Sequence, residues 1–362
     1  MGLFTFGTSN TSVGIDIGTS TVKVVQLKKT PSGPELTGYA IAPVPPSAIE
    51  EGTIKDPQSI AAVIKDMFKS TKIRPDRSFA SISGQNVIMR FTKLPIMSDD
   101  ELEQTVRIEA EQYVPYAIDE VSITHAKLAE LAEEEGGGKY SILLVVAQKE
   151  LVNSYLDVLK GGGATPEVID VDTIAAINSL ENSILLTAGS QEGGEVVAII
   201  DSGARTTNIS VLKSGVLMFT RNIPIAGNNI TQMIMNVMKQ EFEQAEQIKF
   251  NEAEVNISDT SGNEVAEVVK TTVEELASEI RRSFDYFKAQ SREPLIHRII
   301  LSGGSSNLKG FNTYISNELG VDVAMGNPLE GISVTVPDTD ILYNNLQRFT
   351  VAIGLALRGV VD

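Results

Sequence analysis

Hydrophobic and β-branched residues fill positions 13–27 on both sides of a short polar turn, Gly18-Thr19-Ser20. This pattern is typical of two strands joined by a tight turn. A third strand is predicted at 36–42. Apolar residues then recur at helical spacing after Asp56-Pro57, which suit the N-cap and the first turn of a helix. The chain is therefore predicted to open with three strands and a helix.

Residues 86–166 have a pattern of their own. Ser98 and Glu101 have the spacing of a capping box, and the apolar residues after them recur on one helical face up to Pro115. An apolar strand at 140–147 leads into a second amphipathic helix, which ends at the glycines 161–163. We expect this segment to form a separate α+β subdomain inserted after the opening strands.

The opening pattern recurs beyond the polar stretch 187–195, where apolar strands flank Asp201-Ser202-Gly203 and a second polar turn. An internal repeat of this kind indicates a duplicated structural unit. The second half is predicted to contain strands at 196–200, 208–212 and 298–301 and a long helical region at 229–287 that is interrupted near 258–263. We therefore expect two lobes of related structure.

Length and charge narrow the class of protein. The 362 residues exceed the roughly 100–200 residues of one usual domain, which agrees with two lobes. Asp and Glu number 47 against 30 Lys and Arg, and the net charge of −17 repels nucleic acid and anionic lipid. No cysteine is present, which excludes disulfides, thiolate zinc sites and cysteine nucleophiles. We do not expect a nucleic-acid-binding protein.

Targeting signals are not expected either. The residues before Lys23 contain no Lys or Arg and no sustained apolar run, so they lack the features of a secretory signal. No run approaches the ~20 apolar residues that span a bilayer. The two histidines, His125 and His297, have no metal-ligand spacing. We therefore expect a cytoplasmic protein without direct membrane insertion and without a histidine metal site.

Candidate chemistry begins at the first hairpin turn. Asp16, Gly18 and the hydroxyl residues Thr19, Ser20 and Thr21 place backbone N–H groups in a corner that can hold phosphate oxygens, and Lys23 can add a positive charge. The same residue types also suit an ordinary hairpin turn. The second copy, with Asp201, Gly203, Thr206 and Thr207, favours the phosphate interpretation. Paired carboxylates suit Mg²⁺ held through water, so Asp16 and Asp201 are the candidate metal residues.

Two further elements suit a nucleoside. The strand 299–301 runs into Ser302-Gly303-Gly304-Ser305, where a flat ring or a ribose could approach the backbone closely. Glu246 and Lys249 are three residues apart and share one helical face. A solvated ion pair explains the second pattern equally well, so neither element alone identifies a site.

In their order and spacing these motifs resemble the nucleotide-binding motifs of the superfamily of actin, sugar kinases and heat-shock ATPases. The resemblance implies an α/β, actin-like (ribonuclease H-like), two-lobed fold that binds ATP and Mg²⁺. It makes the hairpins the two phosphate loops, and the implied adenosine motif is 299–311. The residues added to the site by the resemblance are Arg205 in the second loop, Gly227 at a helix start, Glu246 and Lys249 beside ribose and adenine, and Gly303, Gly304, Ser305 and Asn307 in the adenosine motif.

The same resemblance identifies two connecting helices, 168–178 and 349–359. A water-orienting carboxylate would lie in the first of them, with Asp172 as the catalytic candidate and Asp170 second, although an aspartate at a helix start is often a simple cap. Arg205 could contact phosphate or pair with a surface carboxylate. Whether ATP is hydrolysed stays open, and weak or absent ATPase activity is expected.

Four parts of the chain follow from the patterns and the resemblance together. They are a first core subdomain (1–85, 167–190 and 349–362), the inserted subdomain (86–166), a second core subdomain (191–228 and 298–348) and a helical subdomain (229–297). The inserted subdomain resembles that of the division protein FtsA. The segments 50–60, 107–116 and 139–160 are more similar to the PilM family of pilus assembly proteins.

The PilM resemblance implies an ATP-binding scaffold of the type IV pilus inner-membrane assembly platform, with Mg-ATP clamped between two lobes. It also implies binding of the N-terminal cytoplasmic tail of a PilN-like protein in a groove between the first and inserted subdomains, and attachment to the inner membrane through that partner. Other platform proteins and self-association are further expectations. The alternatives are a filament-forming division protein like FtsA and a small-molecule kinase of the same superfamily.

Overall fold

The computed structural model describes residues 10–83, 87–131, 138–185, 194–255, 263–291, 293 and 295–361. The predicted boundaries at 85/86 and 190/191, and most of the predicted interruption near 258–263, lie outside these residues. The chain forms two compact units. Unit 1 comprises 1–83, 153–183 and 327–362, and unit 2 comprises 84–152 and 184–326.

Unit 1 is built on a six-stranded sheet in the order β10-β6-β1-β2-β3-β16. Its strands are β1 (Thr11–Ile17), β2 (Thr21–Thr30), β3 (Gly33–Pro43), β6 (Ser78–Ile82), β10 (Pro166–Val171) and β16 (Ser333–Val334). The first three strands are antiparallel, whereas β1, β6 and β10 run parallel. The predicted opening strands are therefore confirmed, and a small hairpin of β4 (Ile49–Glu50) and β5 (Thr53–Ile54) follows them.

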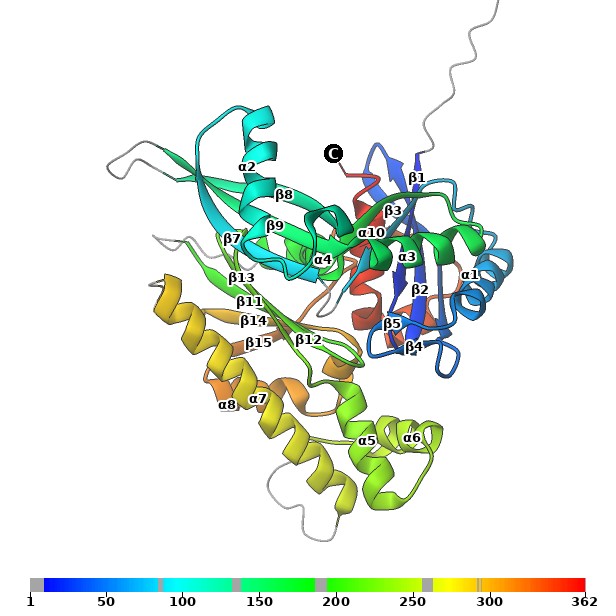
Figure 1. The fold of residues 1–362 in the computed structure, drawn as a ribbon. Helices are drawn as coiled ribbons and strands as arrows, with labels where there is room; N and C mark the ends of the chain where they lie inside the picture. The colour runs from blue at the N-terminus through cyan, green and yellow to red at the C-terminus, as the bar shows by residue number, and fades with distance from the viewer. Residues whose placement is uncertain are drawn as a thin grey trace, which may run out of the picture. The chain divides into compact units, whose positions relative to one another are not determined.

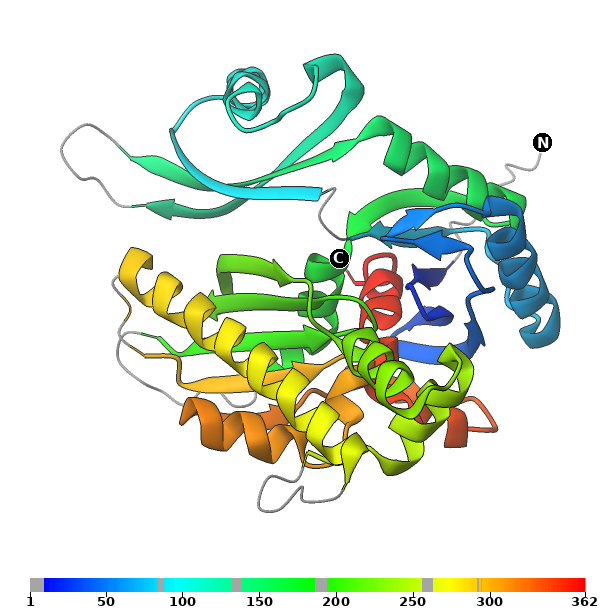
Figure 2. The same cartoon turned by 60° about the horizontal axis from the view of Figure 1, so that its bottom comes forward.

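Helices cover both faces of this sheet. Helix α1 (Pro57–Thr71) and helix α10 (Thr350–Leu357) lie on opposite sides of its strands (Figures 1 and 2). The predicted start of α1 is confirmed, because the Asp56 carboxylate accepts a hydrogen bond from the Ser59 N–H at 3.1 Å. Helix α10 is almost wholly buried, as its unbroken apolar sequence requires.

Two glycines allow α10 to approach its neighbours. A Cβ atom at Gly14 in β1 would lie 1.9 Å from the Ala352 carbonyl oxygen, and one at Gly354 would lie 1.7 Å from the Ala175 carbonyl oxygen. Ala175 belongs to helix α4 (Asp172–Leu185). The strand, α10 and α4 therefore touch backbone to backbone, and only glycine fits at either contact.

The first connecting helix begins later than predicted. Residues 166–171 form strand β10, which pairs in parallel with β6, and the helix starts only at Asp172. The prediction of a helix from Val168 was wrong for these residues. The β-branched side chains of Val168, Ile169 and Val171 favour an extended backbone once a neighbouring strand is available.

The segment 327–348 lies in unit 1, although it was predicted to belong to the second core subdomain. Strand β16 extends the unit 1 sheet by pairing with β3, and Leu329 and Leu342 join the hydrophobic cluster of Leu36 and Phe349. Helix α9 (Asp340–Asn344) and a 3-10 turn (Leu346–Phe349) complete the segment. The rest of the predicted four-part division stays a prediction.

Unit 2 contains a five-stranded sheet in the order β13-β12-β11-β14-β15. The strands are β11 (Val196–Ser202), β12 (Thr207–Lys213), β13 (Val216–Ile223), β14 (Arg298–Ser302) and β15 (Asp322–Met325). As in unit 1, three antiparallel strands adjoin parallel ones. The internal repeat predicted from the sequence is therefore present in the strand arrangement.

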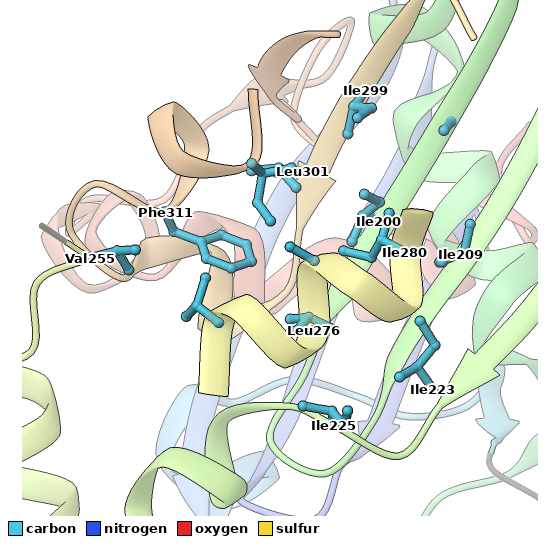
Figure 3. Packing of buried hydrophobic residues seen from close by; sticks show 14 of the residues in the cluster. Ile200, Ile209, Ile223, Ile225, Val255, Leu276, Ile280, Ile299, Leu301 and Phe311 are labelled. Atoms are coloured by element: carbon cyan, nitrogen blue, oxygen red, sulfur yellow. The ribbon is translucent and has the colours of Figure 1, made fainter. Parts of the chain in front are cut away.

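The predicted long helical region forms separate helices. These are α5 (Gly227–Met238), α6 (Phe242–Glu252) and α7 (Glu264–Ser291), and after β14 come the 3-10 turn η2 (Gly304–Asn307) and helix α8 (Phe311–Leu319). Figure 3 shows Leu276 and Ile280 of α7 beside Ile200 and Ile209 of the sheet, within one buried cluster. This apolar contact fixes α7 along the sheet of unit 2.

The inserted segment forms a three-stranded antiparallel sheet in the order β7-β9-β8. Its elements are β7 (Val87–Pro95), α2 (Asp99–Glu111), a 3-10 turn (Ile118–Glu120), β8 (Val121–Leu131) and β9 (Lys139–Gln148). The capping box of Ser98 and Glu101 is confirmed. Leu102, Val106 and Ala110 of α2 pack on the sheet. Helix α3 (Lys149–Gly161) follows β9 directly. No helix among the described residues is long and apolar enough to cross a membrane.

We predict that Gly354→Ala lowers the free energy of unfolding by about 3 kcal/mol, because its methyl group would collide with the Ala175 backbone. Urea denaturation of the whole chain measures this loss. Gly161→Ala is the matched control, since its Cβ would meet one side-chain atom at 3.1 Å. Equal stability of the two variants would contradict the close approach.

Candidate functional site

The two hairpins predicted to bind phosphate have the same backbone pattern. In β1–β2, Ile17 pairs with Val22 and the Gly18 N–H donates to the Thr21 carbonyl at 3.1 Å. In β11–β12, Ser202 pairs with Thr207 and the Gly203 N–H donates to the Thr206 carbonyl at 3.0 Å. The duplication therefore extends to individual hydrogen bonds of the turns.

Each turn exposes two backbone donors. Among the described residues, no acceptor is present for the N–H groups of Thr19 and Ser20, or for those of Ala204 and Arg205. Unused N–H groups at the end of a tight turn form a cavity for an anion. Each hairpin therefore has the donors that a phosphate group requires.

The hairpins differ in charge. In the first, Lys23 lies opposite Asp16 and its ammonium is 2.7 Å from the Asp16 carboxylate, with both side chains 9% exposed. The second hairpin has Asn208 opposite Asp201. Its cation is Arg205 at the turn, whose guanidinium forms no ion pair with any described residue. The predicted alternative of a surface carboxylate partner for Arg205 is thus not seen in the described part of the chain.

In unit 1, polar residues gather at the carboxyl ends of three parallel strands. Asp16 is the next-to-last residue of β1, and Asp172 follows β10. Ser81 and Ser83 lie at the end of β6, the strand between these two. This is the sheet edge at which open α/β sheets bind ligands. The unit 1 sheet therefore brings together predicted site residues that are far apart in sequence.

Asp172 has a strongly perturbed acidity. Burial raises the pKa of its carboxyl from the ordinary value of 3.8 to about 6, and the Asp16 charge adds to the increase. The hydroxyls of Ser81 and Ser83 and the Lys23 ammonium act in the opposite direction. A buried carboxyl group whose ionisation is disfavoured by a neighbouring carboxylate is typical of functional sites. Asp170, the second candidate, is engaged by Arg358 in an ion pair.

Tyr155 of α3 belongs to the same cluster and was missed from the sequence. Its side chain is 5% exposed, and burial together with the charges of Asp172 and Asp16 raises the pKa of its phenol. In the helical pattern it occupies the apolar face with Leu151 and Leu159, so its position in the sequence indicates an ordinary core residue. Only the fold reveals that its phenol lies within electrostatic range of two carboxylates.

In unit 2, the Gly203 carbonyl joins three elements of the predicted site. It accepts hydrogen bonds from the Gly227 N–H at 3.2 Å and from the Ser305 hydroxyl at 2.6 Å. The Asn228 N–H also donates to the Ala204 carbonyl at 2.6 Å. The second hairpin, the start of α5 and the turn η2 are therefore held together by their backbones.

The glycines of this region permit that contact. Gly303 has a φ of 82°, and a Cβ atom there would lie 2.3 Å from the Ser202 carbonyl oxygen and 2.7 Å from Asp201 Oδ1. A Cβ atom at Gly227 would lie 2.7 Å from Ser305 Oγ. These glycines are required by protein packing itself. Gly304, Ser305 and Asn307 form the turn η2, next to this contact.

Glu246 and Lys249 form the predicted ion pair on α6, and both contact Thr231 of α5. The Lys249 ammonium donates to Thr231 Oγ1 at 2.8 Å and to the Gly227 carbonyl at 3.2 Å. Thr231 also contacts the Glu246 carboxylate and is wholly buried. Thr231 was missed from the sequence. Its spacing of four residues from Gly227, within a helical face of isoleucines, is the signal that could have indicated it.

A metal site made only of protein side chains is not found in the described part of the chain, which contains no group of three or more His, Cys, Asp or Glu suited to an ion. His297 Nδ1 accepts a hydrogen bond from the Val196 N–H, and His125 lies in β8. The histidines thus have structural positions. Asp16 and Asp201 can contribute to a magnesium site in which water and phosphate oxygens supply the other ligands.

The duplicated hairpins and sheets define an actin-like α/β fold, as predicted. Solved structures with this fold include MreB 5 of Spiroplasma citri bound to AMPPNP, with 12% identity, a TM-score of 0.55 and coverage of 96% of this chain and 95% of that chain. The ethanolamine utilization protein EutJ from Carboxydothermus hydrogenoformans has 16% identity and a TM-score of 0.55, over 96% and 89% of the two chains.

The chain belongs to the family described as type IV pilus assembly protein PilM, which it matches over residues 14–360. A chain in the solved PilM-PilN type IV pilus biogenesis complex is 28% identical, with a TM-score of 0.84 and coverage of 97% of this chain and 99% of that chain. The predicted family is therefore confirmed.

Cell division protein FtsA is a more distant relative. The Bacillus subtilis protein is 23% identical, over 87% of this chain and 78% of FtsA. The Pseudomonas aeruginosa protein is 24% identical, over 96% of this chain and 89% of that protein. These similarities agree with the predicted FtsA branch of the superfamily.

We predict that Asp172→Asn raises the free energy of unfolding at pH 7.5 by about 2 kcal/mol. The folded-state pKa lies above the unfolded one, so the wild type loses stability as pH rises from about 4 to about 6. The increase in the free energy of unfolding of the variant over the wild type should therefore be complete above about pH 6 and absent below about pH 4. Urea denaturation across this range measures it, and a gain independent of pH would contradict the assignment.

Proposed function

We propose that this protein is an ATP-binding scaffold of the type IV pilus inner-membrane assembly platform, and that Mg-ATP bridges its two lobes. The single observation that supports nucleotide binding best is the pair of hairpins with matching register, each with two unused backbone N–H groups. Membership of the PilM family supports the place of the protein in pilus assembly.

In this proposal, the phosphates bind the turns of both hairpins. The N–H groups and hydroxyls at Thr19 and Ser20 serve one turn, and those at Ala204 and Arg205 serve the other. Arg205 supplies positive charge, since its guanidinium forms no ion pair with any residue that the structure describes. Gly18 and Gly203 hold the turns in shape, with the hydroxyls of Thr21 and Thr206 at their ends.

Magnesium is proposed to bind through water to Asp16 and Asp201, which are the next-to-last residues of the corresponding strands β1 and β11. Their places at equivalent points of the repeat support this assignment. Lys23 reduces the negative charge at Asp16. Asp172 stays the candidate for orienting a water molecule, and we propose weak or absent ATP hydrolysis.

The adenosine is proposed to bind in unit 2. Glu246 faces the ribose from α6, and Gly303, Gly304, Ser305 and Asn307 follow β14 beside the second hairpin. The hydrogen bonds at the Gly203 carbonyl support this arrangement because they place the phosphate turn and the adenosine motif in contact.

The proposed partner is the N-terminal cytoplasmic tail of a PilN-like inner-membrane protein. The support is the similarity to a chain from a PilM-PilN complex over nearly the full length of both chains. We propose that the inserted subdomain takes part in binding the tail and that this partner holds the protein at the cytoplasmic face of the inner membrane. Contacts with other platform proteins and self-association are proposed as well.

We predict that the double variant Asp16→Ala, Asp201→Ala weakens Mg-ATP binding at least tenfold, because it removes both carboxylates that are proposed to hold the hydrated ion. Isothermal calorimetry on the full chain measures the affinity. The control is Asp66→Ala, Asp285→Ala, which removes the same charge from exposed helical positions in the two units. Unchanged affinity in the first variant would contradict the proposed site.

We predict that replacing residues 87–148 by a short Gly-Ser linker abolishes binding of a synthetic PilN-like tail peptide. Fluorescence anisotropy with a labelled peptide measures this binding. Retained ATP affinity shows that the variant is folded, because every proposed nucleotide contact lies outside the deleted residues. Peptide binding equal to that of the wild type would overturn the role of the inserted subdomain.

A further inference from the structure

Lys249 has used its hydrogen-bonding capacity inside the protein. An ammonium group has three donors. Lys249 donates to Thr231 Oγ1 at 2.8 Å and to the Gly227 carbonyl at 3.2 Å, and it forms an ion pair with Glu246. Its side chain is only 15% exposed. No donor is left for a nucleotide, so Lys249 acts on the protein around it.

The Thr231 hydroxyl lies between Lys249 and Glu246, and it accepts a hydrogen bond from the first and donates one to the second. This hydroxyl has a single proton, and its oxygen already accepts a hydrogen bond from Lys249. That proton is within hydrogen-bond range of two acceptors, the Gly227 carbonyl at 3.1 Å and Oε1 of Glu246, and the charged carboxylate is the stronger acceptor. The chain of donation therefore runs from Lys249 to Thr231 to Oε1 of Glu246.

Only one oxygen of Glu246 is engaged in this chain. Both Lys249 and Thr231 contact Oε1, and Oε2 has no hydrogen bond with any described residue. The Glu246 side chain is 30% exposed. Because Oε1 is held from two sides, the direction of Oε2 is fixed before a ligand arrives, and a fixed acceptor loses little entropy on binding.

We propose that Thr231 is a positioning residue that directs Oε2 of Glu246 toward the ribose hydroxyls of the nucleotide, and that Lys249 holds Thr231 and Glu246 in place. The inference rests on the proposed function and adds to it a preference for ribonucleotides over deoxyribonucleotides. A carboxylate accepts hydrogen bonds from hydroxyls, and a bound ligand without that hydroxyl would cover the carboxylate oxygen without giving it a hydrogen bond.

The test compares ATP with 2′-deoxy-ATP and 3′-deoxy-ATP by calorimetry on the full chain. The wild type should bind ATP at least tenfold more tightly than one of the deoxy analogues. Thr231→Val keeps the shape and removes the hydroxyl, and it should reduce that ratio to about threefold or less. Thr231→Ser, which restores a hydroxyl, should recover the wild-type ratio.

Thr272→Val is the matched control. Thr272 is also buried in a helix of unit 2, and its hydroxyl donates to the Val268 carbonyl four residues earlier. Thr231 has the same spacing to the Gly227 carbonyl, but among the described residues Thr272 has no hydrogen bond to α6. Its variant should lose similar stability and keep the wild-type ratio. If Thr231→Val does not fold, Thr231→Ala and Glu246→Gln provide the same comparison, and each should reduce the ratio.

The outcomes separate this inference from the proposed function. Absence of ATP binding by the wild type would contradict the proposed function. ATP binding with equal affinity for both deoxy analogues would overturn the inference and leave the proposed function standing. A ratio in Thr231→Val equal to that of the wild type, or a ratio reduced equally in Thr272→Val, would also overturn it. A reduced ratio in Thr231→Val that Thr231→Ser restores would support it.

Discussion

The carbonyl oxygen of Gly203 is the contact on which the unit 2 site depends. It accepts from the Gly227 N–H and the Ser305 hydroxyl, so one backbone atom fixes the phosphate turn, the start of α5 and the turn after β14. A carbonyl oxygen can accept two hydrogen bonds, and a buried one that loses them costs about 1–3 kcal/mol. Lys249 donates to the Gly227 carbonyl, so helix α6 is also held in a defined position relative to the start of α5.

The two hairpin turns share one backbone geometry but differ in charge. The position of Lys23 in the first hairpin corresponds to Asn208 in the second, and that of Ser20 corresponds to Arg205. The first hairpin therefore has a buried, neutralised ion pair, and the second has a cation at its turn without a carboxylate partner among the described residues. The two turns share their backbone hydrogen bonds because these bonds do not depend on the side chain. Their charges differ because charge depends only on the side chain.

Local signals in the sequence were sufficient for much of the fold. The caps at Asp56 and Ser98 and the hairpin at Gly18 involve residues within a few positions of one another, so the pattern contains them. The pairing of β16 with β3 and the strand β10 depend on segments distant in sequence, which no local pattern records. Tyr155 and Thr231 were missed for the same reason, since each lies on an apolar helical face and its polar group matters only after the fold brings other elements to it.

Helix α3 has a mechanical consequence. Its residues 149–152 are counted with unit 2 and its residues 153–161 with unit 1, yet its backbone hydrogen bonds run without a break. The helix begins at Lys149, directly after the last strand of the inserted sheet. Lys149 in turn donates to the Asp119 carbonyl at 2.8 Å, within the inserted segment. This hydrogen bond ties the first turn of α3 to the 3-10 turn (Ile118–Glu120), so the chain leaves strand β9 of the inserted sheet in a fixed direction.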